Sequence, residues 1–451
     1  MTRRDRTPEP TQAPPTRAFV VHVETKAAGD ARSPEARLAE AQGLALAIDL
    51  DVVGSAIVRL AAMRPSTLIG AGKVEELASR VSELEAGLVI FNAQLTPGQQ
   101  RNLEKALKAK VLDRTGLILE IFGRRARTRE GALQVELAHL TYQKSRLVRS
   151  WTHLERQRGG FGFLGGPGET QIEADRRMIE ERVAKLERDL EGVRKTRALH
   201  RKGRARVPYP IVALVGYTNA GKSTLFNTLT RAGVDARDLL FATLDPTMRQ
   251  VRLPHGRKIV LSDTVGFISN LPTMLIAAFR ATLEEVLEAD VILHVRDMAS
   301  PEAASEADDV AEVLEELGID ERRRAASVLE VWNKADLLPE DRRQALGHAA
   351  ERREDAVLVS ALTGEGLDDL LATIEQRLAR KGEMFSIALE AEEGAELAWI
   401  YGHAEVLERT DDRKHGRVRL MARFEPSRLA LARRRFGARL EAPEAFAFAA
   451  E

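Results

Sequence analysis

The chain contains the stretch Gly216-Tyr217-Thr218-Asn219-Ala220-Gly221-Lys222-Ser223. This stretch fits the pattern Gly-x4-Gly-Lys-Ser, and it lies between the apolar run Ile211–Val215 and the helical pattern Thr224–Leu229. In a strand, glycine loop and helix of this kind, backbone N–H groups and the positive end of the helix attract phosphate groups. The stretch therefore predicts an α/β domain with a doubly wound, mostly parallel sheet and a phosphate-binding loop after a strand.

Two side chains of this loop carry the expected chemistry. The Lys222 ammonium would neutralise the β- and γ-phosphates of a nucleotide, and the Ser223 hydroxyl would ligate Mg2+. A second motif, Asp263-Thr264-Val265-Gly266, follows the apolar run Ile259–Leu261. An Asp at such a strand end holds Mg2+ through water, and a Gly lets its backbone N–H approach the γ-phosphate. Asp-x-x-Gly alone is a common turn, but its place after the phosphate loop favours a nucleotide site.

The segment between the two motifs reads Phe241-Ala242-Thr243-Leu244-Asp245. A Thr at this point can close over Mg2+ and the γ-phosphate and can be released on hydrolysis. We choose Thr243 over Thr247, and the alternative is that Thr243 is an ordinary loop residue. The candidate catalytic residues are thus Lys222, Thr243 and Gly266, and the candidate metal ligands are Ser223, Thr243 and Asp263.

Base specificity is predicted by Asn333-Lys334-Ala335-Asp336, which follows the apolar run Val328–Trp332. The Asp336 carboxylate would accept the N1–H and exocyclic amine of guanine, donors that adenine lacks, so the motif argues against ATP. Asn333 would contact the O6/N7 side of guanine or brace the loop, and the Lys334 stem would cover the base. In Ser360-Ala361-Leu362, the backbone amide of Ala361 would reach guanine O6. We therefore expect Mg2+ as cofactor and GTP and GDP as substrate and product.

The residue after Gly266 bears on the rate of hydrolysis. In small GTPases such as Ras, that position holds a Gln that orients the attacking water. Here it is Phe267, which can neither donate nor accept, so we expect slow hydrolysis that a partner raises. The alternative is that Phe267 packs beneath the switch and another side chain positions the water.

Length and composition limit the other possibilities. The 451 residues predict two to four domains, and the formal net charge of +0 indicates that any RNA-binding surface is local. The chain has no cysteine, which excludes disulfides and thiolate chemistry and suits a reducing compartment. No run of about eighteen apolar residues predicts a membrane span, and the N-terminus lacks a hydrophobic signal segment. We expect a cytoplasmic protein.

Alternating apolar and helical patterns divide the chain into five parts and predict individual elements in the first and last domains. Strands are expected at 18–23, 88–91, 111–112 and 418–421, and helices at 74–84, 96–107 and 427–435, the second helix with Thr96 as N-cap and Pro97 at its first position. We expect a disordered tail over 1–16, an N-terminal α/β domain over 17–127 and a helical arm over 128–207. A GTPase domain over 208–382 and a small C-terminal α/β domain over 383–451 follow. The arm is expected to be a long antiparallel helical hairpin with a Gly-rich tip and a basic linker.

The arm tip is Gly159–Gly168, and aromatic and arginine residues lie close to it. These residues are Arg146, Arg149, Trp151, Arg156, Arg158, Phe161 and Phe163. Bare backbone, aromatic faces and guanidinium groups suit irregular RNA, and the alternative is a flexible loop that folds back on the arm. Gly70-Ala71-Gly72-Lys73 could bind a second phosphate but reads more readily as a turn. Arg433–Arg435 reads as a solvated helix face.

Several motifs resemble the HflX family, ribosome-associated GTPases of the Obg–HflX superfamily. The GTPase motifs match, including Phe241–Thr247 and Asp263–Phe267, and Gly166–Glu173 is similar to the family's helical-domain signature. Ile69–Glu76 and Gln99–Glu104 are similar to its N-terminal domain. The resemblance runs from about residue 17 to 380 and covers the C-terminal domain least. Phe163-Leu164-Gly165 departs from it, because a basic residue is expected there.

The resemblance implies binding to the large ribosomal subunit and GTP-dependent splitting of stalled or idle ribosomes, with the helical loop reaching towards the subunit's catalytic centre. We therefore expect a Mg2+-dependent GTPase that acts on the large subunit and its RNA as a monomer, without a DNA partner. The alternatives are a GTPase of large-subunit assembly and a GTP-gated RNA-binding scaffold.

Overall fold

The computed structural model describes most of the chain in several segments. These are residues 15–24, 32–60, 62–157, 167–204, 209–231, 240–241, 243–244, 247–269, 271–272, 275, 283, 285–380, 382–412, 416–424 and 426–442. The arm tip, with Arg158, Phe161 and Phe163, lies outside them, as do Ala242 and Asp245. None of the described helices combines the length with the continuous apolar character that a membrane span requires.

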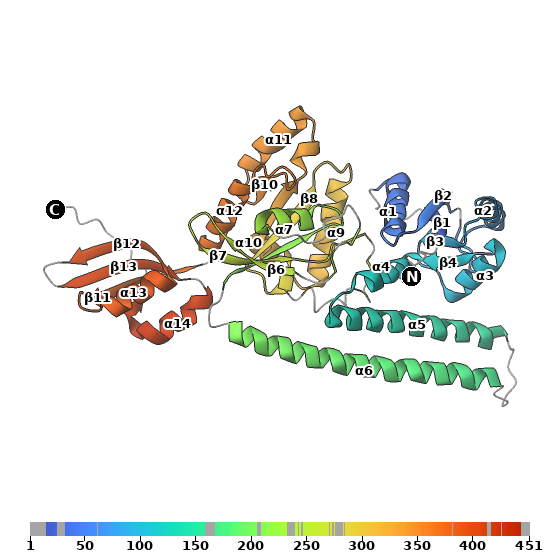
Figure 1. Cartoon of the computed structure of the whole chain (residues 1–451), viewed down its shortest axis with the longest axis horizontal. Helices are drawn as coiled ribbons and strands as arrows, with labels where there is room; N and C mark the ends of the chain where they lie inside the picture. Colours follow the sequence, from blue (N-terminus) through green and yellow to red (C-terminus); the bar gives the residue numbers. More distant parts are fainter. Residues whose placement is uncertain are drawn as a thin grey trace, which may run out of the picture.

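The N-terminal domain is a parallel α/β layer (Figure 1). Its elements are β1 (Arg17–Glu24), α1 (Pro34–Leu46), β2 (Asp51–Arg59), α2 (Ala71–Glu83), β3 (Leu88–Asn92), α3 (Pro97–Leu107), β4 (Lys110–Asp113) and α4 (Arg114–Arg125). The sheet order β2-β1-β3-β4 is parallel throughout. The predicted start of α3 is confirmed, because the Thr96 side chain and the Gln99 side chain form a reciprocal capping box. We expected β1, β3, β4, α2 and α3, whereas β2, α1 and α4 were missed.

The arm consists of α5 (Arg129–Gln157) and α6 (Pro167–Arg204), which lie side by side below the N-terminal and GTPase domains in Figure 1. The 38 residues of α6 correspond to a helix of about 57 Å. Ion pairs join the two helices, from Arg182 to Glu136 at 2.6 Å and from Lys144 to Glu180 at 3.1 Å. The antiparallel helical hairpin that the charge pattern predicted is therefore present.

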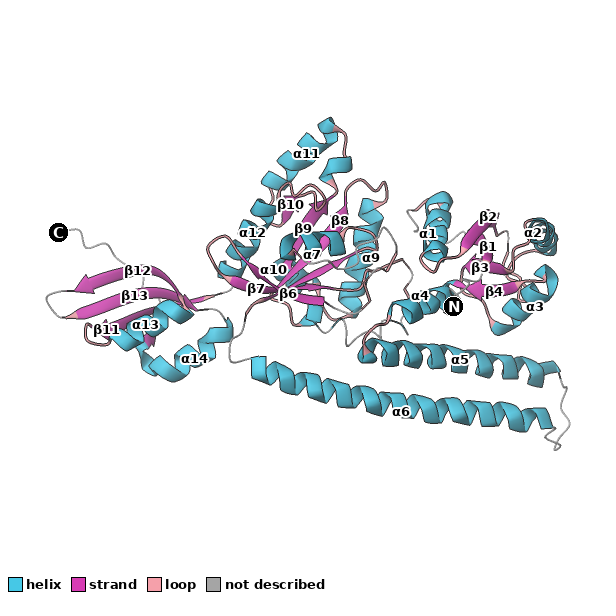
Figure 2. Cartoon of the chain, viewed as in Figure 1, coloured by secondary structure: helices cyan, strands magenta, loops and turns pink. Residues whose placement is uncertain are grey.

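The GTPase domain contains a six-stranded sheet in the order β10-β9-β8-β5-β7-β6. The strands are β5 (Ile211–Gly216), β6 (Thr247–Arg252), β7 (Lys258–Asp263), β8 (Val291–Asp297), β9 (Val328–Asn333) and β10 (Ala356–Leu358). Its helices include α7 (Lys222–Thr230), α9 (Ala303–Glu316), α10 (Glu321–Ser327), η1 (Ala335–Leu337), α11 (Glu340–Glu351) and α12 (Leu367–Arg380). Only β6 is antiparallel to its neighbour, so the predicted doubly wound, mostly parallel sheet is confirmed (Figure 2).

The C-terminal domain has strands and helices, as expected, but its sheet is antiparallel. The elements are β11 (Glu383–Glu390), α13 (Gly394–His403), β12 (Glu405–Asp412), β13 (Arg417–Phe424), α14 (Pro426–Phe436), η2 (Gly437–Arg439) and β14 (Leu440–Glu441). The predicted strand Val418–Met421 lies in β13, and the predicted helix Ser427–Arg435 lies in α14. Figure 1 shows this domain at the end of the molecule opposite the N-terminal domain.

Candidate nucleotide site

The phosphate loop joins the buried strand β5 to α7, and two of its glycines are required by their surroundings. Gly216 has a φ of 151°, and a Cβ there would lie 2.2 Å from the Val295 carbonyl oxygen. Gly221 has a φ of 92°, and a Cβ there would lie 2.2 Å from the Asn333 side-chain nitrogen. Larger residues would therefore displace the phosphate loop from β8 and from the Asn333 side chain at the end of β9. These two neighbours fix the shape of the loop.

Lys222 is buried at the start of α7. Its Nζ donates to the Gly216 carbonyl at 3.0 Å and to the Tyr217 carbonyl at 2.6 Å. Burial lowers the pKa of Lys222 to about 8, and the charge of Asp263 opposes that shift. An anionic phosphate group at this loop would favour the charged ammonium and so reverse the effect of burial. The arrangement thus suits an anion.

The three predicted metal ligands converge. Ser223 Oγ lies 2.8 Å from Thr243 Oγ1 and donates to Asp263 Oδ2 at 2.8 Å, and Thr243 Oγ1 donates to the same carboxylate oxygen at 3.0 Å. An octahedral Mg2+ with ligands at about 2.1 Å places adjacent oxygens roughly 2.9 Å apart. The other oxygen, Asp263 Oδ1, is buried without a hydrogen-bond partner among the described residues. Burial raises the pKa of Asp263, against hydrogen bonds that lower it. The Ser223 and Thr243 hydroxyls at this spacing fit adjacent ligands of Mg2+, and the Asp263 carboxylate beside them fits contact with the metal through water.

The segment after Asp263 lies directly on the phosphate loop. A Cβ at Gly266 would approach Lys222 Nζ and Thr218 Cγ2 to 3.0 Å each. Phe267 N–H donates to the Gly216 carbonyl at 3.1 Å, and Thr218 N–H donates to the Phe267 carbonyl at 2.7 Å. The Phe267 ring is buried in the core, which is the packing that we gave as its alternative role. Thr264 is also buried, with Oγ1 bonded to the Leu214 carbonyl at 2.6 Å, and Val265 joins the core.

The predicted base-binding residues lie in two segments, at the ends of β9 and β10, that hydrogen bonds connect. Asn333 Nδ2 donates to the Ala220 carbonyl at 2.8 Å, and Asn333 Oδ1 accepts the Ala361 N–H at 2.9 Å. Asn333 thus braces the loops, one of the two roles expected of it, and the Ala361 amide already has an acceptor. Ser360 Oγ donates to Asp336 Oδ1 at 2.6 Å. The Lys334 ammonium pairs with Asp297 at 2.7 Å.

Other predicted site residues lie in different surroundings. Phe241 is buried and packs edge-to-face on Phe122 of α4, with ring centroids 4.8 Å apart, so its ring belongs to the core. Leu244 and Ala335 are buried as well, and Leu362 is 76% exposed. Tyr217 and Asn219 line a cavity of about 480 Å³ between the phosphate loop, α1 and the start of α9. At the start of α2, Lys73 pairs with Glu76 at 2.5 Å.

Sequence reasoning missed a buried polar cluster that joins the N-terminal domain to the site. Its members are Arg32, Glu40, Arg114, Ser269, Asp309 and the hydroxyl of Tyr217. Glu40 is 177 residues from Tyr217 and 229 from Ser269 in the chain. No local pattern signals contacts across such separations.

A phosphate loop, a converging Ser, Thr and Asp, and an Asn-Lys-x-Asp loop on a doubly wound sheet define a P-loop GTPase. The chain matches four family models in order: "GTP-binding GTPase N-terminal" over residues 35–123, "GTP-binding GTPase Middle Region" over 125–204, "50S ribosome-binding GTPase" over 211–334 and "HflX C-terminal domain" over 345–445. It is 52% identical to GTPase HflX of Magnetococcus marinus, over 88% of this chain and 90% of that one. It is 44% identical to GTPase HflX of Escherichia coli, over 80% and 84%.

The chain therefore belongs to the GTPase HflX family, and it is a GTP hydrolase. The C-terminal domain, which the sequence resemblance covered least, lies within the match to the HflX C-terminal domain. Among solved structures, the chain is similar to the "SsGBP and GDP complex", at 25% identity and a TM-score of 0.46, covering 80% of this chain and 98% of that one.

Proposed function

We propose that the chain is a Mg2+-dependent GTPase that binds the large ribosomal subunit and, in its GTP-bound state, splits or rescues stalled or idle ribosomes. Hydrolysis then resets the switch. The observation that carries the proposal is the convergence of Ser223, Thr243 and Asp263 beside a phosphate loop, within a region similar to a 50S ribosome-binding GTPase. The likeness to proteins named GTPase HflX supports the same function.

In the proposed site, Mg2+ would be held by the Ser223 and Thr243 hydroxyls and, through water, by Asp263, and it would neutralise charge on the β- and γ-phosphates. Lys222 supplies a further positive charge from a buried position. The Gly266 N–H would donate to the γ-phosphate. Binding and release of the γ-phosphate thereby controls whether Thr243 stays closed over the site.

Hydrolysis is proposed to be slow without the ribosome. Phe267 is buried in the core, so the position that holds a water-orienting Gln in Ras offers no polar group here. The attacking water must then be positioned by other groups. Binding to the ribosome is proposed to complete the arrangement of these groups. The rate on the ribosome should therefore exceed the rate of the free protein.

The arm is the proposed element for contact with ribosomal RNA. Arg146 of α5 bonds to Asp113 at 2.6 Å, and Tyr142 donates to the same carboxylate at 2.6 Å, so α5 is held firmly on the N-terminal domain. The longer helix of this hairpin spans about 57 Å, and the hairpin is proposed to present its Gly-rich tip to RNA. The aromatic and arginine residues near that tip suit irregular RNA.

The test measures phosphate release from GTP by the free chain, with purified large subunits and with whole ribosomes, in Mg2+ and in EDTA. Lys222→Ala serves as the inactive control. We expect slow turnover alone, an increase of about tenfold or more with large subunits, and no turnover in EDTA. Equal rates with and without subunits contradict ribosome activation, and full activity in EDTA contradicts the metal site.

Light scattering of whole ribosomes tests the splitting step. Splitting with a non-hydrolysable GTP analogue, but not with GDP, is expected. Splitting that requires hydrolysis contradicts the proposed order of events. Stimulation by large subunits without splitting favours the assembly role, and RNA binding without turnover favours the GTP-gated scaffold.

A further inference from the structure

Glu40 on α1 of the N-terminal domain occupies an unusual position for a helical glutamate. Its carboxylate is 12% exposed and lies between two guanidinium groups that are also nearly buried. Arg114 donates to Oε1 at 2.7 Å, and Arg32 donates to Oε2 at 3.3 Å. Buried charges must be paired, because an unpaired one costs several kcal/mol. The two arginines therefore hold the Glu40 carboxylate in place.

The same carboxylate bonds both to the phosphate loop and to the segment that follows Gly266. Oε2 accepts the hydroxyl of Tyr217, the second residue of the phosphate loop, and Oε1 accepts the hydroxyl of Ser269 at 3.2 Å. Burial and the Glu40 charge raise the pKa of Tyr217, which keeps its phenol protonated and able to donate. One residue of the N-terminal domain, Glu40, thus contacts both the phosphate loop and the switch segment that follows Gly266.

Tyr217 passes the contact on to the backbone of the switch. Its hydroxyl oxygen accepts the Ser269 N–H at 2.9 Å and the Arg32 guanidinium at 2.7 Å. Arg114 adds a bond to the Ser269 carbonyl at 2.8 Å. Both hydrogen-bonding groups of the Ser269 backbone are therefore held by the cluster, and Arg32 extends it to Asp309 on α9.

Ser269 lies close to the residue that would meet the γ-phosphate. It follows Gly266 by three residues, and Phe267 between them is bonded to the phosphate loop in both directions. Gly266 lies directly against the phosphate loop, since a Cβ there would approach Lys222 and Thr218 to 3.0 Å. A displacement of Gly266 also moves the chain towards Ser269, where the Glu40 cluster resists it.

We infer that Glu40 is a positioning residue for the GTP switch: through Tyr217 and Ser269 it holds residues 266–269 against the phosphate loop, and so couples the N-terminal domain to the γ-phosphate. The inference rests on the proposed role of the Gly266 amide. Because GDP has no γ-phosphate, the coupling acts on GTP and not on GDP. By linkage, a GTP analogue must tighten the docking of α1 as much as docking tightens the analogue.

The test compares Glu40→Gln with Glu35→Gln, a matched change at an exposed position on the same helix. Affinities for a fluorescent GTP analogue and for GDP are measured on the full chain in Mg2+, without ribosomes. We expect Glu40→Gln to weaken the analogue by about fivefold or more and GDP by less than about twofold. Glu35→Gln is expected to change neither. Equal losses for both nucleotides, or no loss, overturn the inference.

Amide hydrogen exchange in α1 supplies the reciprocal measurement. The analogue is expected to slow exchange in α1 more than GDP does, and this difference is expected to vanish in Glu40→Gln. If Glu40→Gln does not fold, Tyr217→Phe removes the hydroxyl that links Glu40 to Ser269 and must give the same nucleotide selectivity. If the GTP affinity of the wild-type chain does not depend on Mg2+, the proposed metal site is refuted, regardless of the hydrogen exchange measured in α1.

Discussion

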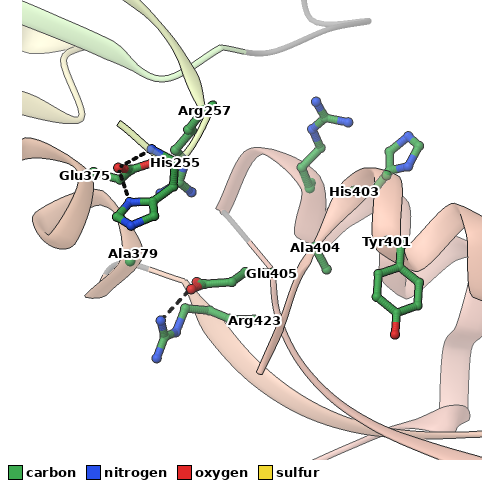
Figure 3. A pocket seen from close by; sticks show the side chains of 12 residues that line it. His255, Arg257, Glu375, Ala379, Tyr401, His403, Ala404, Glu405 and Arg423 are labelled. Carbon is green, nitrogen blue, oxygen red and sulfur yellow. Dashed lines mark hydrogen bonds and ion pairs between the residues drawn. The ribbon is translucent and has the colours of Figure 1, made fainter. Parts of the chain in front are cut away.

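The GTPase domain contacts its two neighbouring domains in opposite ways, at an N-terminal junction with the N-terminal domain and at a C-terminal junction with the C-terminal domain. On the N-terminal side, nearly buried charged groups of the N-terminal domain bond across to the GTPase domain: Arg114, 8% exposed, donates to the backbone of Ser269, and Arg32, 6% exposed, pairs with Asp309. On the C-terminal side, a polar cavity of about 500 Å³ separates the β6–β7 turn and α12 from the C-terminal domain (Figure 3). There His255 pairs with Glu375 at 2.8 Å on one side, and Arg423 pairs with Glu405 at 3.1 Å on the other.

This difference determines what each junction can transmit. A buried ion pair has few solvent molecules to replace a lost partner, so its geometry is enforced. A pair in which His255 is 86% exposed is screened by water and salt and contributes little. The N-terminal junction can therefore report a movement of the switch, whereas the ion pairs seen at the C-terminal junction each stay within one domain.

The largest expected effect comes from breaking the N-terminal junction at Arg114. Arg114→Met leaves the Glu40 carboxylate and the Asn92 side-chain oxygen, which accepts from Arg114 at 2.6 Å, without that partner. We expect the free energy of unfolding of the N-terminal domain to fall by about 3 kcal/mol, because a buried charge loses its compensation. Urea unfolding followed by hydrogen exchange in β1 and β3 measures it.

The matched change at the C-terminal junction is Arg423→Met. Its partner Glu405 is half exposed, so the loss should stay below about 1 kcal/mol. A loss at Arg423 as large as that at Arg114 would show that the two junctions do not differ in the way proposed.

A smaller effect is expected where the N-terminal domain holds the arm. Asp113 is buried and accepts from Arg146, Tyr142 and the Gly116 N–H, the last at 2.8 Å. Asp113→Asn removes the negative charge opposite Arg146 and places an amide N–H donor beside the groups that donate to Asp113. Asn remains a good helix cap. We expect local opening of α5 to become easier by about 2 kcal/mol.

Hydrogen exchange of α5 amides checks this prediction. Asp49→Asn is the control, since Asp49 pairs with Arg124 at an exposed position and should leave α5 unchanged. Unaltered exchange in Asp113→Asn would mean that packing, and not this carboxylate, fixes the arm.

The sequence predicted the parts of the site whose chemistry is local. The phosphate loop, the Asp263 motif and the Asn333 motif each consist of a few consecutive residues after an apolar strand, and the sheet brings these strand ends together. The start of α3 was predicted for the same reason, because Thr96, Pro97 and Gln99 are neighbours in the chain. Patterns confined to one segment can be recognised without knowing the fold.

The junctions could not be predicted in this way. Glu40 looks like any charged residue on a helix, and its significance arises only when α1 is placed beside Tyr217 and Ser269. Likewise β2 and β12 were missed, because most of their residues are half-buried or exposed and show no long continuous apolar run. Tyr217 was assigned to the nucleotide by its place in the loop, yet its hydroxyl faces the N-terminal domain.

The smallest expected effect is a difference between the two junctions in how the free energy of unfolding depends on pH. His22 is buried in β1, where its Nδ1 lies 3.2 Å from the Asn92 amide nitrogen, whose oxygen is occupied by Arg114. The amide must therefore donate to His22, which requires a neutral ring. Burial lowers the pKa of His22, and the charges of Arg37 and Arg114 lower it further, against Glu24 and Glu40.

The unfolded chain binds a proton at His22 near a pH of about 6.5, while the folded chain binds it only at lower pH. Stability is thus fully present above this pH and falls as pH drops through the interval below it, since the unfolded state binds more protons there. The free energy of unfolding should change less between pH 7.5 and 5.5 in His22→Asn than in the wild type. This difference should be smaller than the free-energy loss expected for Asp113→Asn. His255→Asn, at the exposed C-terminal junction, is the control, and an equal difference there would remove the contrast between the two junctions.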